Sequence, residues 1–247
     1  MTPKEVSIQY IDKSNTFLKR SSSSIFMGGI MAGMLIAMAG YVSYGATYDS
    51  SVFVGEGITK ILRGIIFSFG LLGIVLSGGD LFTGTLLYVP GTSNKQKIEL
   101  TKRIALVLFS NFVGSIALLV LLQLAGSLHP KLIDIVNPIA KTKLYLDPIK
   151  AVSAGFLCNF LVCLALRAME ASKDAAGKAI ACILIITVFF IGSFEHSVAN
   201  LFIIPAGLGL QILGLWVFYK TLFFVVLGNI LGGVFLGYAT GYIYKDI

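Results

Sequence analysis

Charged residues are scarce in this chain of 247 residues. Asp, Glu, Lys and Arg together make up 13% of it, whereas 56% of the residues are hydrophobic and the mean hydropathy is +0.89. A chain of this size with so little polar material cannot cover a water-soluble globule. The composition therefore excludes a soluble domain and predicts an all-α integral membrane protein.

Cysteines and metal-binding motifs are scarce as well. Cys158, Cys163 and Cys182 all lie in apolar segments, which is typical of small packing residues rather than of a disulfide or zinc site. Catalytic patterns such as G-x-S-x-G and H-E-x-x-H are missing, although Ser193 and Ser197 flank His196. We therefore expect no enzyme activity, no metal and no cofactor.

Apolar segments long enough to cross about 30 Å of hydrocarbon recur along the chain. Six such spans are predicted, at approximately residues 24–44, 58–87, 103–128, 148–169, 179–204 and 213–242. Residues 22–247 are thus expected to form one multi-pass membrane domain. In residues 1–21, Val6, Tyr10 and Phe17 recur at helical spacing, which predicts a helix on the cytoplasmic membrane surface; the alternative is a disordered tail.

The 19 Lys and Arg residues indicate the orientation of these spans. With the N-terminus inside, most of them, among them Lys245, fall on the inner side. The positive-inside rule then places both termini in the cytoplasm, in the inner (plasma) membrane of the cell. Topology and membrane lipid therefore account for the net charge of +7, and no nucleic-acid partner is expected.

Two of the six spans are interrupted by polar residues. The second contains SGGDLFTG at 77–84 and the fifth contains SFEHSVAN at 193–200. A helix that stops at membrane depth leaves backbone N–H and C=O groups unpaired, which is tolerated only where they are buried in protein or line a cavity. Such breaks in matching places of two halves indicate a transport site. Asp80, Glu195 and Gly79 are expected to have structural roles at the breaks.

The two halves of the chain also resemble each other. The third span contains Asn111-Phe-Val-Gly114 and the sixth contains Asn229-Ile-Leu-Gly232. Since each half has three spans, the second must cross the membrane in the opposite direction to the first. This predicts a 3+3 inverted repeat whose broken helices, spans 2 and 5, meet near the midplane.

The strings GGDLFTG (78–84) and FEHSVANLFIIP (194–205), with CNFLVCLA (158–165) in the fourth span, closely resemble the formate–nitrite transporter (FNT) family of bacterial anion channels. The resemblance covers nearly the whole chain. It implies a six-span aquaporin-like bundle, a pore in each subunit and a homopentamer. It also implies a small anion substrate, with formate ranked before nitrite and hydrosulfide.

The resemblance further assigns roles to single residues. His196 matches the pore histidine of the family and Thr83 the threonine that faces it. The other pore or substrate-binding positions are Asn159 and Asn200, together with Lys143. Of these three, Lys143 lies on the outer loop before the fourth span. The constriction positions are Phe67, Leu71, Leu81, Phe82 and Phe189.

An anion that enters an apolar constriction loses its hydration and gains nothing in return. Lys143, the N-terminal ends of the helices after the breaks and a hydrogen bond from His196 are expected to offset that loss, and the backbone N–H groups at those helix ends are expected to coordinate the oxygens of the anion. We hypothesise that the ion crosses as its neutral acid, with the proton supplied through His196 or through water. Two alternatives stay open: an aquaporin-like channel for neutral solutes, despite the missing Asn-Pro-Ala signatures, and an alternating-access symporter.

Overall fold

The chain forms helices and no strand over residues 1–244, the part that the computed structural model describes. Lys245, which contributes to the predicted charge asymmetry, lies outside the described residues. In chain order the elements are α1 (Pro3–Lys19), α2 (Ser22–Gly45), α3 (Ser50–Ser77), α4 (Phe82–Thr85), η1 (Leu86–Tyr88), α5 (Lys97–Leu124), α6 (Pro130–Leu144), α7 (Pro148–Ala171), α8 (Ala175–Ile191), α9 (Ser197–Leu208), η2 (Leu210–Gly214) and α10 (Trp216–Ile243).

Five helices, α2, α3, α5, α7 and α10, are long and apolar enough to cross a membrane. The shorter apolar helices α8 and α9 follow one another where the sequence predicts the fifth span. Large apolar side chains such as Leu76, Phe109 and Phe235 are exposed on the outer surfaces of these helices. Helices that are apolar on all sides are typical of a membrane protein.

Both predicted helix breaks are present. α3 ends at Ser77 and helical structure resumes at Phe82, while α8 ends at Ile191 and α9 begins at Ser197. Gly78 ends α3 in the left-handed region, with φ 74°, which glycine adopts without a side-chain clash. The chain therefore leaves and re-enters helical structure twice inside the bundle.

Each break is tied to a neighbouring long helix through its acidic residue. The Asp80 N–H donates to the Gly28 carbonyl of α2 at 3.0 Å, and the Glu195 N–H donates to the Ala154 carbonyl of α7 at 3.3 Å. A Cβ on Gly79 would lie 3.5 Å from the Gly28 carbonyl oxygen, an ordinary van der Waals distance, so packing against α2 does not by itself require glycine here. These bonds satisfy backbone donors that the interrupted helices leave without a partner.

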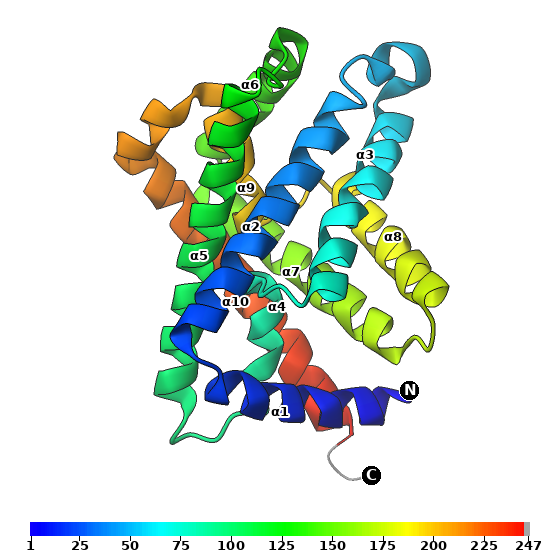
Figure 1. The fold of residues 1–247 in the computed structure, drawn as a ribbon. Helices are drawn as coiled ribbons and strands as arrows, with labels where there is room; N and C mark the ends of the chain where they lie inside the picture. The colour runs from blue at the N-terminus through cyan, green and yellow to red at the C-terminus, as the bar shows by residue number, and fades with distance from the viewer. Residues whose placement is uncertain (245–247) are drawn as a thin grey trace.

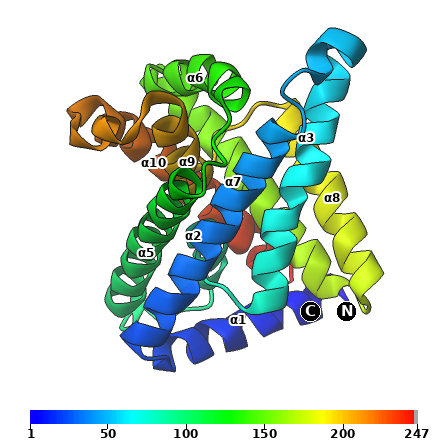
Figure 2. The same ribbon diagram turned by 45° about the horizontal axis from the view of Figure 1, so that its top comes forward.

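The helix α6 is absent from the sequence prediction. Pro130 begins it, and Leu132, Val136, Ala140 and Leu144 are its buried residues. α6 packs against α9, at the end of the bundle opposite α1 (Figures 1 and 2). In the sequence, its two prolines and its terminal lysines are typical of a loop, which is why no helix was predicted here. The apolar spacing of four residues was the signal that could have predicted it.

The surface helix expected near the N-terminus is α1, which lies across one end of the long helices (Figure 1). Thr2 and Glu5 form a capping box at its start. The hydrogen bond from the Thr2 backbone lowers the pKa of the Glu5 carboxyl. The face of α1 that carries Val6, Tyr10 and Phe17 is buried against the bundle.

Within each half, two long helices pack together through close contacts between their backbones. α2 packs along α5, and α7 packs along α10. A Cβ on Gly33 would lie 2.2 Å from the Asn111 carbonyl oxygen, and a Cβ on Gly232 would lie 2.2 Å from the Phe156 carbonyl oxygen. No side chain fits at such a distance, so only glycine at these positions allows the two helices of each pair to pack this closely. Both contacts are within one subunit.

Candidate functional site

The two helix breaks meet at Thr83 and His196. Thr83 belongs to the short helix α4, and His196 is the N-cap residue of α9. The Thr83 Oγ1 and His196 Nε2 atoms lie 3.1 Å apart although the residues are 113 positions apart in the chain. Both side chains are buried. The tertiary structure therefore brings together the two polar residues that the sequence predicts to face each other.

A backbone hydrogen bond fixes the orientation of the His196 ring. Its Nδ1 accepts the Ala199 N–H at 3.1 Å, so this nitrogen carries no proton. The proton of the neutral imidazole is therefore on Nε2, which donates to the Thr83 hydroxyl oxygen. This assignment leaves the hydroxyl proton of Thr83 available to donate to a bound anion.

Apolar side chains surround this polar pair. The ring centroids of Phe67 and Phe189 are 6.1 Å apart, and the Phe189 ring is 6.3 Å from the His196 ring. All predicted constriction residues are buried, namely Phe67, Leu71, Leu81, Phe82 and Phe189. An anion at this level meets apolar surface, which cannot replace its hydration.

Two cavities approach the Thr83–His196 pair from opposite ends of the bundle. We call the one on the α6 side the outer cavity and the one on the α1 side the inner cavity, following the predicted orientation. The outer cavity has a volume of about 400 Å³ and extends to Phe189 and His196. The inner cavity has a volume of about 570 Å³ and extends to Leu81. Thr83 and His196 therefore lie between the two cavities, and the fully buried Thr83 side chain lines neither of them.

Lys143 lies on a helix and not on an open loop as expected. It is the penultimate residue of α6, and its Nζ is 2.8 and 2.9 Å from the two carboxylate oxygens of Glu195. The two side chains are only 13% and 8% exposed. Burial lowers the pKa of Lys143, but the Glu195 carboxylate and its hydrogen bonds outweigh burial, so the pKa lies above its ordinary value. As a unit the pair is neutral.

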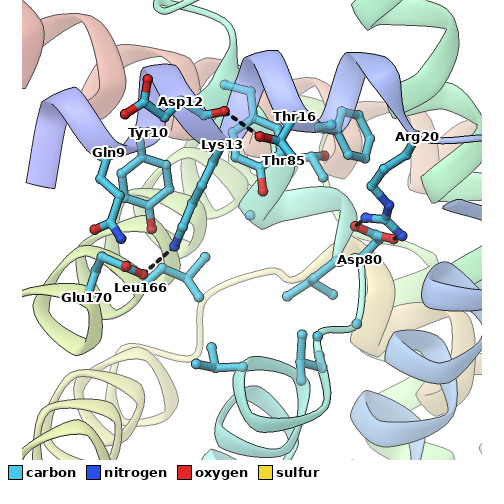
Figure 3. Close-up of a pocket in the computed structure, with 18 residues that line it drawn as sticks. Gln9, Tyr10, Asp12, Lys13, Thr16, Arg20, Asp80, Thr85, Leu166 and Glu170 are labelled. Atoms are coloured by element: carbon cyan, nitrogen blue, oxygen red, sulfur yellow. Dashed lines mark hydrogen bonds and ion pairs between the residues drawn. The ribbon is translucent and has the colours of Figure 1, made fainter. Parts of the chain in front are cut away.

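A second ion pair holds the first break on the inner side. Arg20, directly after α1, donates to both carboxylate oxygens of Asp80, at 2.7 and 2.8 Å (Figure 3). Lys13 of α1 forms an ion pair with Glu170 of α7 in the same cavity (Figure 3). Tyr10 is packed beside them, and burial raises the pKa of its hydroxyl. α1 thus forms one wall of the inner cavity and is bonded to both halves of the chain.

The backbone donors at the starts of α4 and α9 already have partners. Asn111 Oδ1 accepts the Phe82 N–H and Asn229 Oδ1 accepts the Ser197 N–H, both at 2.9 Å. The Ala199 N–H is bonded to the histidine ring. The expectation that these N–H groups coordinate an anion is therefore wrong for these three donors. Their partial positive charge remains, but their hydrogen bonds are used within the protein.

The two asparagines predicted to line the pore have different environments. Asn200 lines the outer cavity, and its Nδ2 donates to Glu195 at 2.7 Å. Asn159 lines neither cavity; its Nδ2 donates to the carbonyl oxygens of Thr83 at 3.2 Å and Asn229 at 2.7 Å. Asn159 therefore contacts the pore only through the backbone of α4.

The side chains that could hold a metal are dispersed. Among residues 1–244, no three His, Cys, Asp or Glu side chains are grouped so that they could bind an ion. Cys158, Cys163 and Cys182 are buried and are not joined by disulfides. The chemistry that this site offers is hydrogen bonding and charge, supplied by a histidine, a threonine and the cations of the cavities.

Comparison with known proteins decides the family. Residues 4–244 match the family model described as formate/nitrite transporter. The chain belongs to this formate/nitrite transporter family. It is 30% identical over 214 residues to the formate channel FocA of Haemophilus influenzae, which covers 84% of this chain and 75% of the relative.

Two further comparisons agree with this assignment. Over 189 residues the chain is 32% identical to the formate channel FocA of Escherichia coli K12, covering 74% of this chain and 66% of that relative. A solved pentameric formate channel with formate bound superimposes with a TM-score of 0.80 and 29% identity, over 92% of this chain and 99% of that chain. The chain is therefore an integral membrane protein with the fold of the formate/nitrite transporter channels.

In this member of the formate/nitrite transporter family, the sequence reasoning overlooked two cations of the outer cavity. Lys60 and Arg63, both on α3, line that cavity together with Lys143. In the sequence analysis, Lys60 and Arg63 served only as outer-side charges for the orientation of the spans. The signal that could have identified Arg63 is its place within an apolar segment, because ionisable residues inside membrane spans are generally functional.

Proposed function

We propose that this chain forms a channel for small monovalent anions of weak acids, with formate as the first candidate and nitrite or hydrosulfide as alternatives within the family. The observation that carries the proposal is the Thr83–His196 pair at the meeting point of two broken helices, between two cavities. The names of the relatives, which are formate channels, support the ranking of formate.

In this proposal the anion crosses the constriction as its neutral acid. Moving a conjugate base from water into an apolar environment raises its pKa, so protonation becomes easier at the constriction. The His196 Nδ1 atom is occupied by the Ala199 N–H, and a proton cannot bind there without loss of that bond. We therefore assign the proton to cavity water. His196 Nε2–H orients the Thr83 hydroxyl, which donates to the anion as it loses hydration.

The test is uptake of labelled formate into proteoliposomes over an acidic-to-neutral pH series. Uptake should rise as the external pH falls, because more of the neutral acid forms. His196→Asn keeps a side-chain acceptor that can cap α9 but loses the ring donor, so it should slow uptake at every pH and keep the pH slope.

His129→Asn is the matched control. His129 also caps a helix, since its Nδ1 accepts the Lys131 N–H at 3.2 Å at the start of α6, but it is exposed and far from the Thr83–His196 pair. This variant should transport like the wild type. Uptake that does not depend on pH would refute passage as the neutral acid. Wild-type rates in His196→Asn would refute the role of the pair.

We further infer that five copies assemble, each with its own pore, because the matching solved channel is described as pentameric. The excess of Lys and Arg on the α1 side supports a plasma-membrane orientation with both termini in the cytoplasm and contact with anionic lipid. Native mass spectrometry of the purified protein would test the number of copies. Labelling of single cysteines introduced into α1 and α6 from either side of the membrane would test the orientation.

A further inference from the structure

Arg63 is a buried cation in the wall of the outer cavity. It lies on α3 one helical turn from the constriction residue Phe67, and it is 9% exposed. Both residues line the outer cavity, as do Lys143 and His196. Any solute that travels through this cavity toward the Thr83–His196 pair therefore passes Arg63.

The charge of Arg63 is not neutralised by an acid. Over residues 1–244 the ion pairs involve the cations Lys13, Arg20, Arg103 and Lys143, and none involves Arg63. Two acids, Glu56 and Glu195, line the same cavity. Glu56 forms no ion pair with Arg63, and Lys143 and Asn200 already bind the Glu195 carboxylate. Buried charges in proteins are normally paired or fully hydrogen bonded. An arginine that is nine-tenths buried without an acidic partner thus suits an anionic ligand.

The C-terminal end of α2 fixes the guanidinium group from two sides. Arg63 Nε donates to Thr47 Oγ1 at 2.9 Å, and the Cζ atom lies 5.1 Å from the centroid of the Tyr44 ring. Ser43 Oγ donates to the Arg63 carbonyl at 2.9 Å, which holds the backbone at the same level. The side chain is therefore positioned before any ligand arrives, so that binding loses little conformational entropy.

The geometry of these bonds determines which edge of the guanidinium group remains available. Arginine carries five N–H donors, and in Arg63 the one on Nε is used by Thr47. The four on Nη1 and Nη2 have no protein acceptor in the described part of the chain. These two nitrogens form the end-on fork that binds the two oxygens of a carboxylate with two parallel hydrogen bonds.

We propose that Arg63 forms an outer subsite that selects planar anions with two oxygens, such as carboxylates and nitrite, before they reach the constriction. An anion with a single heavy atom, such as chloride or hydrosulfide, can meet the two N–H groups only at one point and cannot form the two parallel hydrogen bonds, one to each oxygen. The subsite rests on the proposed function, because it takes the outer cavity as the entrance of the pore. It names Arg63 rather than Lys143 as the cation that contacts the substrate there.

The proposal is tested with Arg63→Lys, which keeps the positive charge but loses the fork. In wild-type proteoliposomes, acetate should inhibit labelled formate uptake at a concentration about tenfold lower than chloride does, because only acetate places a separate oxygen opposite each nitrogen. In Arg63→Lys, acetate and chloride should inhibit at similar concentrations. Lys60→Arg is the matched control, since Lys60 lines the same cavity one turn farther out, and it should keep the wild-type preference for acetate.

Binding to the purified full-length protein in detergent separates the subsite from transport. Calorimetric titration with acetate should show binding that Arg63→Lys weakens about tenfold and that chloride does not reproduce. If the wild type takes up no formate but binds acetate in this way, the proposed function fails and the subsite stands. If formate uptake is present, but the wild type does not prefer acetate to chloride or Arg63→Lys retains the preference, the subsite is refuted and the channel function stands.

A second variant tests the subsite without replacing Arg63, in case Arg63→Lys does not fold. Thr47→Val removes the acceptor of the Nε hydrogen bond and leaves the charge in place. Without that bond the guanidinium group is less well positioned, so the preference for acetate over chloride should fall several-fold. An unchanged preference in Thr47→Val, together with normal folding, would contradict the positioning that the subsite requires.

Discussion

Asn111 and Asn229 make the same three hydrogen bonds in opposite halves of the molecule. Each Oδ1 accepts the first N–H after a helix break, at 2.9 Å. Each Nδ2 donates to the carbonyl of the acidic residue in that break, Asp80 or Glu195, at 2.9 Å. Each Nδ2 also donates to a glycine carbonyl on the neighbouring long helix, at 2.8 Å for Asn111 and 2.9 Å for Asn229. One side chain thus replaces the helical hydrogen bonds that each break removes.

Asn229→Ala should therefore destabilise the protein strongly. The substitution leaves the Ser197 N–H and the Glu195 carbonyl without partners, whereas the Gly155 carbonyl keeps its bond within α7, and each unpaired buried group costs about 1 to 3 kcal/mol. We expect a loss of at least about 2 kcal/mol, seen as a lower unfolding temperature of the purified protein. Asn94→Ala, in an exposed turn, is the control and should leave the unfolding temperature unchanged. Equal unfolding temperatures for the two variants would contradict this account.

Because Lys143 and Glu195 form a buried ion pair, we expect the stability of the folded protein to fall strongly when either partner is replaced alone. Lys143→Met leaves the Glu195 carboxylate buried with only the Asn200 amide as a partner, and breaking a buried pair costs about 3 to 5 kcal/mol. Lys143→Met combined with Glu195→Gln should be less destabilised than the sum of the single variants. Additive effects would show that the two side chains are not coupled.

Glu99→Gln provides the comparison for this double-mutant cycle. Glu99 pairs with Arg103 on α5, but its side chain is 51% exposed. An exposed pair contributes about 0 to 1 kcal/mol, so its loss should change the unfolding temperature little. A large effect at Glu99 would mean that the difference between the two pairs does not arise from burial.

Two glycines of α10 should respond differently to alanine. A Cβ on Gly232 would lie 2.2 Å from the Phe156 carbonyl oxygen, whereas a Cβ on Gly241 has open space within 4 Å. Gly232→Ala forces α7 and α10 apart and should cost about 1 to 3 kcal/mol or more. Gly241→Ala, at an exposed helical position, should be neutral or stabilise by about 0.5 to 1 kcal/mol. Thermal unfolding of both variants measures the difference, and a tolerated Gly232→Ala would contradict the close backbone contact.

Thr83→Val should impair transport without a large change in shape. The substitution replaces the hydroxyl that faces His196 Nε2 with a methyl group and so removes the donor proposed for the anion. Formate uptake should fall about tenfold, which corresponds to one hydrogen bond lost at the constriction. Thr83→Ser should restore it. Thr101→Val, at an exposed position of α5, should leave uptake unchanged, and full activity of Thr83→Val would refute the role of the hydroxyl.

Lys143 illustrates how far the sequence reasoning reached and where it stopped. The apolar spans place it on the outer side, and the resemblance assigns it to the pore. Its pairing with Glu195, 52 residues later, depends on how α6 packs against α9. Since α6 was not predicted, the pairing was beyond reach. Arg63 received no role because its contacts with Tyr44 and Thr47 depend on how α3 packs against α2.

The sequence by itself determined that this is a helical membrane protein with two interrupted helices. The length of the apolar segments and the polar strings at 77–84 and 193–200 were sufficient for that. A membrane tolerates unpaired backbone groups only where protein buries them or a cavity hydrates them. Only the tertiary structure decided which polar side chains meet at the breaks. Hydrogen bonds and ion pairs act over about 3 Å, and residues more than 50 positions apart reach that distance only through the packing of whole helices.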